Sequence, residues 1–267
     1  MRVQTEEWRK FIPGVRMYKG KKTLFLNGEK LWSEGQPLVY DRKERNSWEV
    51  IIILPGVEII PEGTFYYCKN VEIVIMADAV KRIEKWAFSN CYSLKFVKLS
   101  RNLEFIGISA FQLCKSLTSI FMPPSCREIA ETAFLWCKKL IILGLPQHIQ
   151  LGESVFQKTK LMKNSPLEID EYGCYNYGNE EEAVQWLKSI NNGETQALHR
   201  ACASYNPLSE TIHDLVMRQG IKAMRIPNAI GVTPSQYLAA NPFAEISEKE
   251  IINRYILDSM GEIVLPR

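Results

Sequence analysis

The cysteine and histidine side chains of this chain could ligate a metal, and a cysteine thiol could also act as a nucleophile. The chain has seven cysteines and three histidines. Four cysteines, Cys68, Cys91, Cys114 and Cys137, recur every 23 residues, so a stacked repeat would place them in a straight column. A tetrahedral zinc site needs four ligands converging at about 2.3 Å on one point, which a column cannot supply. We therefore expect buried thiols and no bound metal.

The remaining candidates for catalysis are also dispersed. His148, His199 and His213 belong to no His-Glu-x-x-His arrangement, and neither His148 nor His213 has a nucleophile close to it in sequence. The glycine-containing stretch 14–23 has the wrong spacing for a phosphate-binding loop. The sequence predicts no catalytic residue and no cofactor, so we expect that the protein is not an enzyme.

Internal repetition is the strongest feature of the sequence. Five phenylalanines are separated by 23, 23, 23 and 22 residues: Phe65, Phe88, Phe111, Phe134 and Phe156. The unit is Ile-x-x-x-x-Phe-x-x-Cys-x-x-Leu-x-x-Ile/Val and is complete at 106–120. A period of roughly 20–29 residues is typical of leucine-rich repeats. Units this short bury their apolar columns only by stacking, so the sequence predicts a solenoid.

The repeat also predicts where the chain is extended. Parallel strands are expected over 50–54, 71–76, 94–99, 117–122 and 140–145. Pro123, Pro124 and Pro146 would end their strands, because proline cannot donate to a ladder. A turn of α- or 3-10 helix is expected on the opposite side, at 87–88, 110–111 and 133–134.

The run Ile-Gly-x-x-Ala-Phe-x-x-Cys-x-x-Leu-x-x-Ile-x-x-Pro at 106–123 resembles the BspA-like, Treponema-type leucine-rich repeats. The resemblance covers about residues 48–161 and implies a parallel-sheet solenoid. That family includes surface adhesins and intracellular proteins, so it does not by itself imply one function. The whole arrangement is also similar to a group of diatom proteins with such repeats.

We expect an α+β chain of four parts: residues 1–47, 48–162, 163–178 and 179–267. The first is an N-terminal cap with a β-hairpin turning at Asn27-Gly28, with Trp8, Trp32 and Trp48 shielding the first coil. The second is the solenoid of about five units, and the third is a linker. The fourth is a helical, ankyrin-like region.

Helix signals define the last part. Asn179, Pro207, Pro234 and Ser247 stand where four helices would begin, and Gly220 would end the helix over 208–219. The stretch Gln196-Ala-Leu-His-Arg-Ala201 resembles the ankyrin Thr-Pro-Leu-His-x-Ala signature. The resemblance implies that His199 hydrogen-bonds a turn. A second copy begins at Thr233 but lacks the histidine.

One face of the predicted sheet is unusually apolar for a surface in water. Alternation along the strands places eight candidate partner-binding residues on it: Val50, Ile52, Ile73, Ile75, Phe96, Lys98, Phe121 and Ile142. An exposed apolar patch is typical of an interaction site. Two alternatives remain open, since the helical tail could cover this face or the face could have no special role.

Charge and hydropathy narrow the function classes. The formal net charge is +3, too small to predict nucleic-acid binding. No apolar run reaches the ~20 residues that span a bilayer, and charged residues occupy the place of a signal peptide's apolar region. We expect a cytoplasmic protein, with the nucleus not excluded. The oligomeric state is left open.

These observations favour a non-catalytic scaffold that binds one or more protein partners through leucine-rich repeats. The alternatives are a secreted or cell-surface adhesin-like protein and a regulatory subunit of an enzyme.

Overall fold

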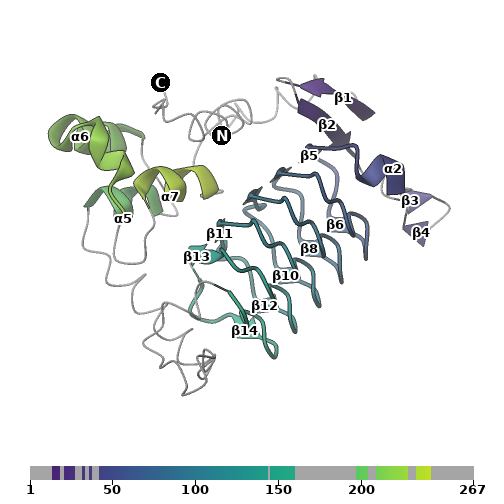
Figure 1. The fold of residues 1–267 in the computed structure, drawn as a ribbon. Helices are drawn as coiled ribbons and strands as arrows, with labels where there is room; N and C mark the ends of the chain where they lie inside the picture. Colours follow the sequence, from purple (N-terminus) through teal and green to yellow (C-terminus); the bar gives the residue numbers. More distant parts are fainter. Residues whose placement is uncertain are drawn as a thin grey trace, which may run out of the picture.

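The computed structural model describes residues 14–18, 21–27, 32–33, 36–37, 42–143, 145–159, 197–203, 209–227 and 233–241. Residues 42–159, apart from 144, form a stack of coils, and helices from the C-terminal part of the chain lie beside it (Figure 1). The predicted linker, the helices expected to begin at Asn179 and Ser247, and Trp8 lie outside the described residues.

One side of each coil contributes a strand to a parallel ladder, as the repeat predicts. These strands are β5 (Val50–Ile53), β7 (Ile73–Met76), β9 (Phe96–Lys98), β11 (Ser119–Phe121) and β13 (Ile141–Leu143). They are hydrogen-bonded in that order within a seven-stranded sheet. The predicted β5 to β13 positions are confirmed to within a few residues at each end.

A second parallel ladder forms on the other side of the coils. It consists of two-residue strands: β6 (Ile59–Ile60), β8 (Arg82–Ile83), β10 (Phe105–Ile106), β12 (Glu128–Ile129) and β14 (Gln150–Leu151). The expected helical turns at 87–88, 110–111 and 133–134 are wrong. These residues form hydrogen-bonded turns instead, because their amide groups also bond to the next coil, as Phe88 N donates to Ala110 O at 2.8 Å.

The interior between the two ladders is a continuous apolar core. The five phenylalanines of the repeat stack in one row, which we call the phenylalanine ladder. Its ring centroids are 5.0, 5.2, 5.3 and 5.9 Å apart in succession. All five rings are fully buried. Such stacking confirms that side chains 23 residues apart share one interior.

The turns that carry the phenylalanine ladder have a strained backbone. Residues two positions before and two positions after each ladder phenylalanine have φ between 52° and 66°. Apart from Gly63, these positions hold residues with side chains, including Trp86 and the β-branched Thr132. Left-handed φ costs such residues on the order of 1–3 kcal/mol each, so the stacking of neighbouring coils must hold these turns in place.

A β-hairpin caps the first coil, but not the predicted one. Strands β1 (Gly14–Tyr18) and β2 (Lys21–Leu26) pair antiparallel, with Tyr18 opposite Lys21. The hairpin therefore turns between these two residues and not at Asn27-Gly28. β2 then pairs in parallel with β5, which extends the long sheet by two strands. Trp48 is buried against Phe65 with ring centroids 6.5 Å apart, which confirms its shielding role.

Two further elements complete the N-terminal part. β3 (Trp32–Ser33) and β4 (Gln36–Pro37) form a small antiparallel pair, and α2 (Arg42–Arg45) precedes β5. Trp32 thus lies in a strand of its own hairpin. Arg45 donates from Nη1 to the Tyr66 carbonyl oxygen at 2.9 Å and so ties α2 to the first coil.

The described C-terminal part is helical, as the sequence predicts. It contains α5 (Ala197–Ala203), α6 (Ser209–Gln219), the 3-10 helix η3 (Ile221–Arg225) and α7 (Pro234–Ala240). α6 ends before Gly220, whose φ is 82°, and α7 begins at a proline. α5 packs on both α6 and α7. The helical content is confirmed here, and the ankyrin-like assignment stays a prediction.

Candidate interaction surfaces

The cysteine column lies inside the solenoid and is closed to solvent. Cys68, Cys91, Cys114 and Cys137 are fully buried free thiols. Cys91, Cys114 and Cys137 each donate from Sγ to the carbonyl oxygen of a ladder phenylalanine on the preceding coil, at 3.0 to 3.2 Å. Burial raises the pKa of the Cys114 thiol well above its usual range. These thiols therefore act as small apolar residues that also bridge coils.

The three histidines lie on different elements of the described structure. His148 is exposed in the turn before β14, His213 is exposed on α6, and His199 is buried on α5 with its ring edge-on to Tyr237 at 6.2 Å. Among the residues that the structure describes, no three His, Cys, Asp or Glu side chains are placed to hold one metal ion. The expectations of no metal, no cofactor and no catalytic residue stay predictions.

The predicted partner-binding face is not open. Val50, Ile52, Ile73, Ile75 and Phe121 are at most 1% exposed. They join Phe96 in one buried cluster with apolar side chains of the helical segment, namely Leu198, Cys202, Ile212, Val216, Ala223, Met224, Tyr237 and Leu238. α7 lies against β9 and β11 (Figure 1). Of the alternatives that the sequence left open, coverage by the helical tail is found where α7 lies against β9 and β11.

Two members of the predicted face behave differently from the rest. Lys98 lies on β9 and is 8% exposed. Ile142 is wrong for this face, because it points into the solenoid core and pairs with Ile120. The step from Ile120 to Ile142 is 22 residues, one fewer than between Val97 and Ile120. A one-residue slip moves a side chain to the opposite face of a strand, so Ile141 takes the outer position instead.

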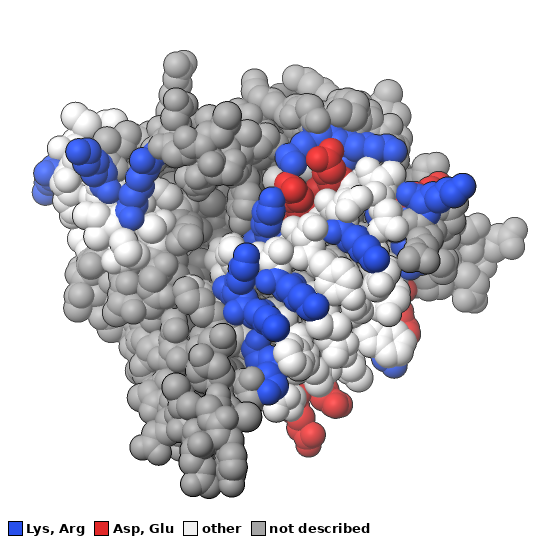
Figure 2. Space-filling view, in the orientation of Figure 1, with Lys and Arg blue, Asp and Glu red and all other residues white. Residues whose placement is uncertain are grey.

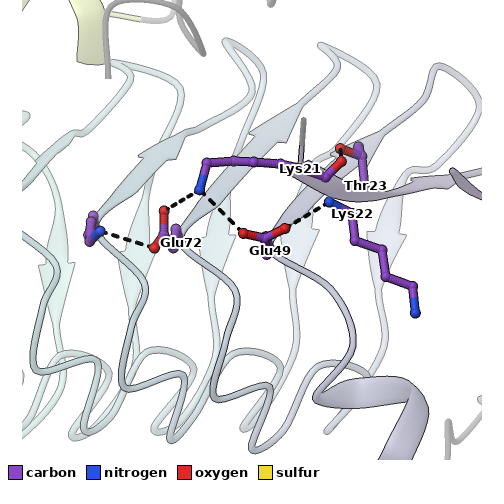
Figure 3. Close-up of polar contacts among 6 residues, drawn as sticks. Lys21, Lys22, Thr23, Glu49 and Glu72 are labelled. Atoms are coloured by element: carbon purple, nitrogen blue, oxygen red, sulfur yellow. Dashed lines mark hydrogen bonds and ion pairs between the residues drawn. The ribbon is translucent and has the colours of Figure 1, made fainter. Parts of the chain in front are cut away.

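A row of charges runs along the edge where the long strands begin (Figure 3). Lys21 of β2 reaches across two coils, with its Nζ 3.5 Å from Glu49 Oε1 and 2.8 Å from Glu72 Oε2. Lys95 approaches Glu72 Oε1 at 3.1 Å, and the Lys22 amide donates to Glu49 Oε2 at 2.9 Å. The repeat spaces Glu49, Glu72 and Lys95 by 23 residues. The contacts of Lys21 with both carboxylates link the hairpin to the repeats.

The carboxyl of Glu72 is the centre of this row, and its pKa reflects that position. Burial acts to raise the pKa, but hydrogen bonds and charges from Lys21 and Lys95 outweigh burial and lower it below its ordinary value of 4.5. The pKa of Lys21 is raised above 10.5 although burial lowers it, because Glu72 and Glu49 hold its charge. The row is therefore structural in character, with each charge already paired.

The turns that follow the phenylalanine ladder carry exposed and half-buried aromatic and basic side chains, which the sequence reasoning missed. We call them the aromatic–lysine strip: Tyr66, Tyr67, Lys69, Tyr92, Lys115, Trp136, Lys138, Lys139 and Lys158. All lie one, two, four or five positions after a ladder phenylalanine. Reading those positions as columns, as was done for phenylalanine and cysteine, would have found the strip.

Figure 2 shows where charge gathers on the visible face. Basic side chains cluster among uncharged ones over the coils that carry β11 and β13. One group of acidic side chains lies instead toward β2 and β5, where the row around Glu72 is found. The distribution is uneven even though the net charge of the whole chain is only +3.

Comparison with known families agrees with the coil geometry. Residues 52–172 match the BspA type leucine rich repeat region, in six copies. The match is confined to the part of the chain that carries the repeats, and it is a similarity to that family. The matched region overlaps the stretch in which the sequence predicted stacked repeats, with a parallel ladder and apolar columns. No protein among those with curated descriptions matches the chain.

Solved structures similar to the chain are bacterial leucine-rich repeat proteins. One is a leucine-rich repeat protein from Eubacterium ventriosum, 20% identical over 46% of this chain and 34% of the other, with a TM-score of 0.39. A leucine-rich cell surface protein from Faecalibacterium prausnitzii is 23% identical over 53% of this chain and 38% of the other, with a TM-score of 0.36. The chain spans little more than a third of either.

A third is the pneumococcal vaccine antigen PcpA, 25% identical over 55% of this chain and 37% of the other, with a TM-score of 0.40. Neither the diatom resemblance nor the ankyrin resemblance is represented among these structures. In the part of the chain described here, no helix combines the length and apolar character needed to cross a bilayer.

Proposed function

We propose that this chain is a non-catalytic module that binds partner proteins through the outer surface of its leucine-rich repeat coils. The observation that carries the proposal is a set of large apolar side chains left exposed on a rigid scaffold. Tyr66, Trp86, Ile108 and Trp136 are each 38 to 41% exposed. Each lies within three residues of a buried ladder phenylalanine, so all four project from the same turns.

The rigidity of these turns supports the proposal. Their backbone amides donate to the next coil, as Tyr67 N does to Ser89 O at 2.9 Å and Trp86 N to Ile108 O at 3.0 Å. Side chains held on a preformed backbone lose less entropy on binding than those on a loop. Tyrosine and tryptophan are also the residues most often found at energetic centres of interfaces.

The placement of the reactive residues favours binding over catalysis. The described cysteines are buried in the solenoid or under the helices, and His148, His199 and His213 lie apart. Six free thiols among the described residues are also consistent with a reducing compartment. We therefore keep a cytoplasmic location as part of the proposal.

Affinity purification followed by mass spectrometry tests this function. The bait is the whole chain, compared with a variant in which Tyr66, Trp86, Ile108 and Trp136 are all changed to Ser. We expect proteins that bind the wild-type chain at a defined stoichiometry to be lost from the variant. Equal recovery of partner proteins by both baits would contradict the proposal. Enzymatic activity of the purified wild-type chain would also contradict it.

A control variant separates specific binding by the repeat turns from nonspecific adsorption to exposed apolar surface. Met217 and Ile226 are 72% and 54% exposed on the helical segment, away from the repeat turns. Changing both to Ser removes exposed apolar area as well, but it should leave the recovered partners unchanged.

A further inference from the structure

The aromatic–lysine strip is continuous across the coils. Tyr66 and Tyr67 have ring centroids 5.9 Å apart, and Tyr67 lies 5.7 Å from Tyr92 of the next coil. Lys115, one coil further, places its Nζ 5.0 Å from the Tyr92 ring centroid. Backbone bonds join the following turns, since Leu113 N donates to Leu135 O at 2.8 Å. The strip therefore runs parallel to the stacking axis.

Four lysines of the strip carry positive charge that no described acid neutralises by an ion pair. Lys69, Lys115, Lys138 and Lys139 form no ion pair within the described ranges, in contrast to Lys21, which contacts two carboxylates. None of the described residues at one, two, four or five positions after a ladder phenylalanine is Asp or Glu. A surface of this kind attracts an anionic partner.

Ring contacts hold the lysines in place and favour a carboxylate partner. Lys69 Nζ lies 4.5 Å from the Tyr67 centroid, while Lys138 and Lys158 lie 5.3 and 5.6 Å from that of Trp136. Cation–π attraction of this type restrains the flexible lysine stems. The same ammonium groups occupy the ring faces on which nucleobases would stack, so the geometry suits pairing with carboxylates better than binding single-stranded nucleic acid.

We propose that the aromatic–lysine strip binds an acidic, extended peptide segment of the partner protein. Carboxylates of the segment pair with Lys69, Lys115, Lys138 and Lys139, and its apolar side chains contact the exposed parts of Tyr66 and Trp136. Coils stack about 4.8 Å apart, so five coils present a strip of roughly 19 Å, which matches about six residues of extended peptide. This inference rests on the proposed function and adds the chemistry of the partner.

Fluorescence anisotropy with a fluorescein-labelled peptide of Glu, Asp and Phe tests the inference on the full chain. We expect saturable binding that weakens as salt is raised, because exposed ion pairs are screened. A peptide with Gln and Asn in place of the acids should not bind. The triple variant Lys115→Glu, Lys138→Glu, Lys139→Glu should bind the acidic peptide at least about tenfold more weakly.

A matched variant controls for net charge. Lys43→Glu, Arg218→Glu and Lys222→Glu make the same charge change at exposed positions on α2, α6 and η3, and this chain should bind the acidic peptide like the wild type. Melting curves of both variants report their folding, and the salt dependence of the wild-type chain tests the proposal without any variant.

Three results would overturn the inference. They are equal peptide binding by the two triple variants, salt-independent binding by the wild type, and tighter binding of oligo-dT or of phosphatidylserine vesicles than of the acidic peptide. If the acidic peptide fails while the wild-type chain still recovers partners that the Tyr66, Trp86, Ile108 and Trp136 variant loses, only the partner chemistry is wrong. If the wild-type chain binds neither the acidic peptide nor any partner that the variant loses, the protein-binding function itself is wrong.

Discussion

An inner phenylalanine of the ladder is stacked between the ladder phenylalanines of the two neighbouring coils. Phe111 stacks between Phe88 and Phe134, with interplanar angles of 5° and 4°. Its ring has no solvent exposure. Removing such a ring leaves a void that the surrounding coils cannot close without breaking their own hydrogen bonds, so the cost combines lost burial with a cavity.

Phe111→Ala should therefore lower the free energy of unfolding by about 3–5 kcal/mol. Urea unfolding followed by circular dichroism measures this loss. Tyr66→Ala, at a ring that is 41% exposed, is the matched control and should change stability by less than about 1 kcal/mol. A near-neutral result for Phe111→Ala would mean that the ladder does not form the core.

Thr132 illustrates a different cost at the same scale. Its φ is 54°, a conformation that β-branched residues rarely adopt, whereas asparagine tolerates it. Asn90 already occupies a left-handed turn position of the repeat, with φ 63°. Thr132→Asn should raise the free energy of unfolding by about 0.5–1 kcal/mol through relief of this strain.

Thermal unfolding measures the change at Thr132. Thr118→Asn is the control, because Thr118 has no left-handed φ. The hydroxyls of both threonines form hydrogen bonds, so each substitution removes one and only the backbone strain differs. This second change should be neutral or destabilising. A gain at both positions would point to asparagine itself and away from backbone strain.

Residue types that recur at a fixed spacing predicted the ladders, because each type occupies the same position in successive coils. Phe and Cys recur where only an inward side chain fits. Ile142 could not be predicted in the same way, since the single-residue shortening before β13 leaves no mark in residue type. Four consecutive apolar residues, Leu140 to Leu143, fit either register.

At the scale of elements, the outer face of the long sheet is a docking surface for the helices of the same chain. α7 contacts β9 and β11, and Phe121 is fully buried in the shared cluster. Phe121→Asp places a charge in that contact, and burying a charge without a partner is strongly unfavourable. We expect the helices to detach while the solenoid stays folded.

Hydrogen exchange with mass spectrometry resolves the two parts in the Phe121→Asp variant. Exchange in 197–241 should speed up, whereas the strands β5 to β9 keep their protection. Thr118→Asp, on the same coil but half-buried at the edge, should leave both parts protected. Uniform acceleration over the whole chain would mean that solenoid and helices unfold as one unit.

The charged row around Glu72 connects the hairpin to the coils. Its contribution should appear in how the free energy of unfolding changes at acidic pH. The pKa of Glu72 is lowered in the fold, so its contribution is present above pH 4.5 and is lost as pH falls through the folded-state pKa. Glu72→Gln should reduce stability by roughly 0.5–1 kcal/mol near pH 7 and by less at lower pH.

Unfolding in urea at pH 3, 5 and 7 tests the Glu72 prediction. The difference between wild type and Glu72→Gln should shrink steadily toward pH 3. A constant difference at all three values would show that the side chain contributes through packing and not through its charge.

Local turn preference explains why the hairpin was misplaced. Asn27-Gly28 is a strong two-residue turn signal. No feature of the neighbouring sequence indicates that 21–26 pairs with β5, more than twenty residues away. Parallel pairing over four residues, from Thr23 opposite Val50 to Leu26 opposite Ile53, decides the place of this strand. The two-residue strands of the second ladder are likewise too short to show a period.

At the scale of the molecule, the two sides of the solenoid have different roles. The outer face of the long sheet is buried, with the chain's own helix α7 against β9 and β11. The turns after the phenylalanine ladder carry rings and lysines at the surface. The region with the strongest apolar pattern in sequence is therefore internal. The surface that we propose for partner binding is recognisable only once the turn positions are aligned coil by coil.

Strand β1 also has a consequence for how long such a molecule can be. All the coils run in one direction, but β1 runs antiparallel to β2 at the end of the sheet, so a further coil of the same hand could not continue from it. Duplicating one 23-residue unit would lengthen the molecule by about 4.8 Å without altering the hairpin, which makes coil number the easiest property of this architecture for evolution to vary.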